Sequence, residues 1–159
     1  MILIARKSAK FNSKKQEKRV AKEIDGKTTL NSGALYFQKG DVRNEKYLIE
    51  CKTTKKAFYT MEVDVWEKIE REAVSDGLRI PIMQVDLLDG KQRYAVIEHA
   101  DYKELKEGTY KDIITFAKSF RLKAQDEISL VKFYDAYGAY LSLCVIPWSD
   151  FIDFIEKGE

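Results

Sequence analysis

The 159-residue sequence contains only two cysteines, two prolines and eight glycines, and these shortages exclude several classes of protein. Cys51 and Cys144 are too few for a disulfide framework, and they lack the paired spacing of metal ligands. The low proline and glycine content excludes collagen-like and low-complexity chains. No apolar run reaches the roughly 18 residues that a transmembrane helix needs. We therefore expect no membrane association and a reducing compartment.

The residues that are abundant are typical of one globular domain spanning residues 1–159. Hydrophobic residues make up 45% of the chain and charged residues 34%, which provides enough apolar material for a core. Residues 1–7 become basic too early for a secretory signal, so we expect a cytoplasmic protein, nucleoid-associated or viral-encoded. Residues 1–12 are predicted to form a basic arm, and residues 108–159 a C-terminal extension packed on the core.

Basic residues are concentrated near the N-terminus. Residues 1–22 contain eight lysines and arginines but a single acid, Glu17. Such a cluster can bind a polyanion, although the solvated face of an ordinary helix would show the same pattern. A second basic group follows residue 52. The candidate DNA contacts are Lys14, Lys15, Lys18, Arg19, Lys55 and Lys56.

Periodicity and turn residues predict a mixed sheet flanked by helices. Ser13 and Gln16 have the spacing of a capping box, which predicts that a helix begins at Lys14, and Gly26 is suited to its end. Residues 110–123 are predicted to be helical or irregular. We expect helices over residues 14–25, 61–76, 101–106 and 149–156, and strands over 28–37, 41–42, 46–52, 80–88, 92–98, 128–134 and 140–146.

The most informative residues lie on two short neighbouring strands. Side chains alternate across a sheet, so Glu50 and Lys52 share one face of the strand over residues 46–52, while Cys51 lies on the other. Asp41 precedes this strand on its neighbour. A carboxylate and an amine on one face of an otherwise apolar strand are costly to bury unless they have a role.

This grouping predicts a metal-dependent phosphodiesterase site. Hard divalent cations bind one or two carboxylates and keep water ligands that a phosphate can replace. Asp41 and Glu50 would supply the carboxylates, and the backbone carbonyl of Cys51 would supply a further oxygen. Lys52 could orient or help to deprotonate the attacking water, or stabilise charge in the transition state. Glu17 could bind a second metal ion directly or through water, or be an ordinary acid favoured by the helix dipole.

The combination of Asp41, the run Glu50-Cys51-Lys52 and a preceding helix that bears Glu17 resembles the PD-(D/E)xK nuclease superfamily. Within that superfamily the chain looks most like the archaeal-type Holliday-junction resolvases, over roughly residues 13–100. The resemblance implies a restriction-endonuclease-like α/β fold, Mg²⁺ held by the acidic residues with Mn²⁺ as a substitute, and hydrolysis assisted by the lysine. It also implies a catalytic serine, for which Ser32 is the nearest counterpart, and a homodimer that acts on four-way DNA junctions.

The sequence therefore predicts a magnesium-dependent endonuclease for branched DNA, a Holliday-junction resolvase of DNA recombination and repair. Two alternatives stay open: a related nuclease for other DNA (single-strand, nicking or restriction-type), and a non-catalytic DNA-binding protein with this fold. The side chain of Cys51 is expected to lie in the core, and His99 is expected to have no role. Packing is the expected explanation for Tyr134, Tyr137 and Tyr140. The apolar C-terminal segment, residues 145–155, suggests a dimer contact.

Overall fold

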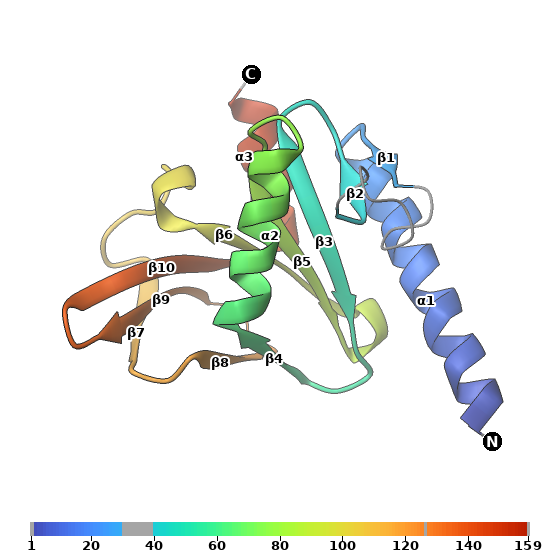
Figure 1. The fold of residues 1–159 in the computed structure, drawn as a ribbon, viewed down its shortest axis with the longest axis horizontal. Coiled ribbons are helices and arrows are strands. Elements are labelled where there is room, and N and C mark those ends of the chain that lie inside the picture. The colour runs from blue at the N-terminus through green and yellow to red at the C-terminus, as the bar shows by residue number, and fades with distance from the viewer. Residues whose placement is uncertain (1, 30–39, 126, 159) are drawn as a thin grey trace.

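The computed structural model describes residues 2–29, 40–125 and 127–158, and the side chains of residues 12 and beyond within these ranges. It shows a mixed α/β fold with an eight-stranded sheet, three helices and a separate two-stranded ribbon (Figure 1). The helices are α1 (Ile2–Glu23), α2 (Val63–Ser75) and α3 (Trp148–Lys157). The strands are β1 (Lys27–Thr28), β2 (Val42–Arg43), β3 (Tyr47–Thr53), β4 (Phe58–Glu62), β5 (Ile80–Leu87), β6 (Gln92–Glu98), β7 (Tyr110–Thr115), β8 (Ser119–Lys123), β9 (Ile128–Asp135) and β10 (Gly138–Pro147).

The large sheet has the order β1-β2-β3-β5-β6-β10-β9-β7, and β4 pairs with β8 in the ribbon. Neighbouring strands are antiparallel, except for the parallel pairs β3–β5 and β7–β9. Helix α2 lies in the connection between β3 and β5 (Figure 1). Thr53 lies opposite Asp86, so the carboxyl ends of β3 and β5 meet at one end of the sheet. The candidate site lies at this end.

Alternation along the strands divides the interior into two cores, one on each face of the sheet. Ile49 and Ile82 belong to the core that α1 and α3 cover, together with Val20 of α1 and Phe151 of α3. The neighbouring position on β5, Met83, belongs to the opposite core, which α2 and the β4–β8 ribbon cover. Figure 1 shows α2 on one face of the sheet and α3 behind it.

The predicted helix start at Lys14 is wrong, because the segment predicted as a basic arm belongs to the same helix from Ile2 onward. Helix α1 runs without a break from Ile2 to Glu23. Ser13 therefore lies inside the helix, where its hydroxyl donates to the Glu17 carboxylate at 3.2 Å and caps nothing. Lysine, arginine and alanine are strong helix formers, and they are frequent in this segment.

Three other predicted elements differ, two of them because their strand pairing is non-local. The segment over residues 110–123 forms β7 and β8 rather than a helix, since it pairs with β9 and β4. Pairing of Phe58–Glu62 with β8 delays the start of α2 to Val63. The helix predicted over 101–106 is only a 3-10 turn at His99–Asp101. The strand predicted over 28–37 lies, after Thr29, outside the described residues.

The C-terminal hairpin and helix are confirmed as β9, β10 and α3. Trp148 and Phe151 are buried in the core of this chain, so the apolar C-terminal segment no longer argues for a dimer contact. Tyr137 is fully exposed, and packing within the chain does not explain it. In the described part of the chain, no helix is long and apolar enough to cross a membrane.

Candidate active site

Asp41 is held at the start of β2 by two hydrogen bonds to β3. Its backbone N–H donates to the Ile49 carbonyl at 3.0 Å, and its carboxylate oxygen Oδ2 accepts from the Cys51 N–H at 2.8 Å. The preceding Gly40 has φ of +67°, and a Cβ there would lie 2.7 Å from Leu48 Cδ1. A side chain here would be strained by this backbone conformation and would have to displace Leu48, so glycine is favoured. Gly40 therefore allows Asp41 to lie against β3.

Glu50 and Lys52 lie on one face of β3, as the alternation predicted. Their side chains form an ion pair with 3.2 Å between Lys52 Nζ and Glu50 Oε1. Burial by itself lowers the pKa of the Lys52 amine, but the Glu50 carboxylate outweighs it, and the net shift of this pKa is upward. Lys52 is therefore a cation at neutral pH.

The side chain of Cys51 lies in the core, as expected, and its backbone N–H donates to Asp41. Its thiol is buried among the apolar residues under α1 and α3, and this burial raises the thiol pKa well above its usual value. The N–H and C=O of one strand residue point to the same side of the strand. Because the Cys51 N–H faces the Asp41 carboxylate, the Cys51 carbonyl points to that side as well.

Glu17 approaches the site from α1. Burial raises the pKa of its carboxyl, and the charge of the Asp41 carboxylate raises it further, against the opposing hydrogen bond from Ser13. Glu50 shows the same two effects, burial first and Asp41 second, and its pKa is also raised. Glu17 and Glu50 thus each interact with the Asp41 carboxylate, and burial together with this repulsion raises both pKa values.

A divalent cation fits this donor set. In the described residues, no three histidine, cysteine, aspartate or glutamate side chains are grouped so that they could hold a metal ion. Magnesium, however, needs only one or two carboxylates and keeps several waters. Asp41 and Glu50 provide two hard carboxylate donors, with the Cys51 carbonyl on the same side as Asp41. A bound cation would offset the repulsion that the Asp41 carboxylate exerts on Glu17 and Glu50.

The remaining predicted site residues differ in what the structure says of them. Ser32 lies outside the described residues. The candidate DNA contacts are all solvent-exposed: Lys14, Lys15, Lys18 and Arg19 on α1, and Lys55 and Lys56 after β3. Sequence reasoning missed Tyr59 of β4, a half-buried phenol whose pKa is raised by burial, with Lys52 opposing and Glu50 adding to the shift.

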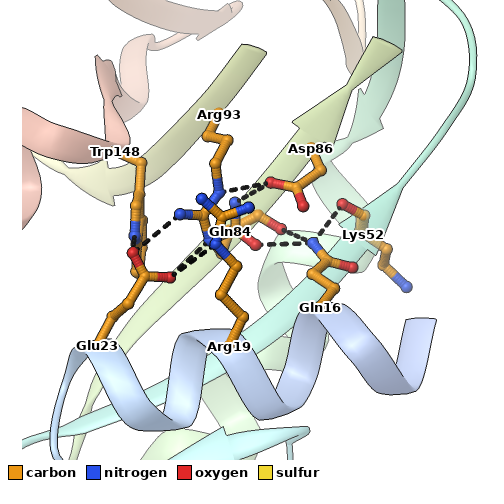
Figure 2. A network of polar contacts seen from close by, with 8 residues as sticks. All are labelled: Gln16, Arg19, Glu23, Lys52, Gln84, Asp86, Arg93 and Trp148. Carbon is orange, nitrogen blue, oxygen red and sulfur yellow. Dashed lines mark hydrogen bonds and ion pairs between the residues drawn. The ribbon is translucent and has the colours of Figure 1, made fainter. Parts of the chain in front are cut away.

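Sequence reasoning also missed a polar network between α1 and the sheet (Figure 2). Arg93 forms a bidentate ion pair with Glu23 of α1, at 2.8 and 2.9 Å, and contacts Asp86 of β5 at 3.2 Å. The indole N–H of Trp148 donates to Glu23 at 3.2 Å. The sequence of β5 could have indicated this network. Gln84 and Asp86 are polar residues on one face of an otherwise apolar strand, as Glu50 and Lys52 are on β3.

Glu17 and Glu23, both on α1, are predicted to affect stability in opposite directions. The pKa of Glu17 is raised in the folded protein, so ionisation of this carboxyl destabilises the fold. The loss of stability is absent below the ordinary pKa of a glutamate and develops as pH rises through the pKa of Glu17 in the folded protein. Burial tends to raise the pKa of Glu23, but hydrogen bonding to Arg93 outweighs it, and the pKa is lowered. The ionised Glu23 therefore stabilises the fold at neutral pH, and this stabilisation is lost as pH falls through the pKa of Glu23 in the folded protein. In metal-free protein at pH 7, Glu17→Gln should raise the free energy of unfolding and Glu23→Gln should lower it.

Urea denaturation in EDTA at pH 7 and again near pH 4 measures both effects. The two variants should converge towards the wild type at the lower pH. A loss of stability in Glu17→Gln at pH 7 would contradict the raised pKa of Glu17 that burial and the Asp41 charge produce.

Comparison with known proteins found no match to a protein-family model and none among curated sequences. The function is therefore argued from the site itself.

Proposed function

We propose that the protein is a magnesium-dependent DNA endonuclease of the PD-(D/E)xK type, with branched DNA as its substrate. The observation that carries the proposal is the Asp41–Cys51 hydrogen bond, which brings the Asp41 carboxylate against the strand that bears Glu50 and Lys52. Exposed lysines on α1 and after β3 support a polyanionic substrate. The mixed sheet with helices on both faces is compatible with a restriction-endonuclease-like fold, which is part of the proposal.

In this proposal each group has a separate task. Asp41, Glu50 and the Cys51 carbonyl would hold magnesium, which when bound would neutralise phosphate charge and make water more acidic. Glu17, with its raised pKa, accepts a proton from the attacking water more readily than an ordinary carboxylate does. The Lys52 cation stabilises the negative charge that develops on the phosphate oxygens. As the water oxygen bonds to phosphorus, the bond from phosphorus to the leaving oxygen breaks, and that oxygen takes up a proton from solvent.

The substrate is tested by comparing three DNAs of equal length with purified protein: a four-way junction, a linear duplex and a single strand. We expect cleavage of the junction in Mg²⁺ or Mn²⁺ and none in EDTA, because both ions prefer oxygen donors. Cleavage of only the duplex or the single strand would favour a related nuclease. Binding to the junction without cleavage under any metal would favour the non-catalytic alternative.

The homodimer is a further part of the proposal. Sedimentation with and without the junction measures it, and a monomer on the junction would contradict it.

A further inference from the structure

Gln16 of α1 is a buried carboxamide, 4% exposed, next to the candidate active site. Its amide nitrogen donates to the Lys52 carbonyl at 2.8 Å and to the side-chain oxygen of Gln84 at 2.7 Å. An amide nitrogen has two protons, so both are used. One side chain therefore joins α1 to β3 and to β5, and the β3 contact is made by a proposed active-site residue.

The partners of Gln84 fix the direction of these bonds. Gln84 is fully buried, and its nitrogen donates to Asp86 Oδ1 at 2.7 Å, an oxygen that also accepts from Arg93 at 3.2 Å. An ionised carboxylate only accepts hydrogen bonds, so the Gln84 amide must turn its nitrogen towards Asp86 and its oxygen towards Gln16. Gln16 thus faces only acceptors, since the Gln84 backbone carbonyl also lies 3.5 Å from its nitrogen. Figure 2 shows this chain of contacts running from Lys52 across the sheet to Arg93.

These contacts restrict which side chain can serve at position 16. A glutamate would place an acceptor against the Lys52 carbonyl and the Gln84 oxygen. An asparagine is shorter by one methylene and would not reach both. The oxygen of the Gln16 amide is itself buried and has no hydrogen-bond partner in the described residues, which costs free energy. An apolar side chain would avoid this cost, but it would leave the Lys52 carbonyl and the buried Gln84 oxygen without the donor that Gln16 supplies.

Gln16 is also the residue next to Glu17. The turn of α1 that Gln16 ties to β3 and β5 is therefore the turn that carries Glu17, whose Oε1 accepts from Ser13 one turn earlier. We propose that Gln16 is a positioning residue of the active site: it fixes α1 against the Lys52 backbone and so sets Glu17 relative to Asp41. The inference rests on the proposed function, since it assigns Gln16 a role in that reaction.

Gln16→Met and Gln16→Asn test this inference. Methionine approximates the volume of glutamine without the donors, and asparagine keeps the amide but shortens the reach. Loss of an outer partner of a metal site costs about 10- to 100-fold in activity or metal affinity, and we expect kcat to fall in this range with an unchanged KM for the junction. We also expect a several-fold rise in the magnesium concentration at half-maximal cleavage, and weaker binding of Mg²⁺ alone in calorimetry.

Glu23→Gln is the matched control. It weakens the other attachment of α1 to the sheet, through Arg93, without touching Lys52. Urea denaturation ranks the variants by stability, so a purely structural role of Gln16 predicts that Gln16→Met and Glu23→Gln lose activity in proportion to stability. We expect instead that Glu23→Gln keeps wild-type kcat and magnesium dependence.

The possible results separate the two proposals. Gln16 variants that cleave and bind Mg²⁺ like Glu23→Gln overturn the positioning role alone, while the wild type and Asp41→Asn still report on the nuclease. A wild-type protein that neither cleaves the junction nor binds Mg²⁺ overturns the proposed function and this inference together. If Gln16→Met does not fold, Gln16→Asn decides by the same measurements.

Discussion

Replacing Asp41 with asparagine is expected to lower the rate of magnesium-dependent DNA cleavage by at least about 10³-fold, since losing a mere outer partner of a metal site already costs 10- to 100-fold. Asparagine keeps the size of the side chain and an oxygen that can accept from the Cys51 N–H. The fold should therefore persist, while the charge that binds the cation is removed. DNA binding should remain, because the exposed lysines are unchanged. Single-turnover cleavage and a gel-shift assay measure the two properties.

Asp112→Asn is the matched control for this substitution. Asp112 is an exposed aspartate on β7 that pairs with Lys132 at 3.2 Å. It should cleave DNA like the wild type. If Asp41→Asn kept more than about a tenth of the wild-type rate, Asp41 would not be a metal ligand of the kind proposed.

Replacing Arg93 with methionine is expected to lower the free energy of unfolding by about 3 kcal/mol or more. The Arg93 side chain is 12% exposed and pairs with both Glu23 and Asp86. Removing the cation leaves the 7%-exposed Asp86 carboxylate without its ion pair, and an unpaired buried charge is costly. Urea denaturation at pH 7 measures the loss.

Arg19→Met provides the comparison, because Arg19 shares the acceptor Glu23. It lies 3.7 Å from the same carboxylate oxygen but is 58% exposed, so we expect a loss below about 1 kcal/mol. Equal losses in the two variants would show that the Arg93 network does not stabilise the attachment of α1.

The core of the candidate site could be predicted from the sequence because it depends on local alternation. Two-residue periodicity places Glu50 and Lys52 on one face and Cys51 on the other, and the structure agrees. Turn chemistry likewise predicted β9, β10 and α3 with small errors at their ends. These elements are specified by neighbouring residues, so local patterns describe them well.

The parts that the sequence did not reveal depend on contacts between distant segments. Residues 110–123 form strands because β9 and β4 offer them partners, which no local pattern indicates. The link from Gln16 to Gln84 spans 68 residues, and that from Glu23 to Arg93 spans 70. Gln16 resembled the second member of a capping box, whereas in the folded chain it is an interior contact to the sheet.

The most direct test of the central claim is cleavage of a four-way junction by the purified wild-type protein, in Mg²⁺ and in EDTA, beside Asp41→Asn. The account predicts cleavage by the wild type in Mg²⁺, none in EDTA with recovery after Mg²⁺ is restored, and none by Asp41→Asn. Cleavage that persists in EDTA, or that Asp41→Asn performs at the wild-type rate, would contradict it.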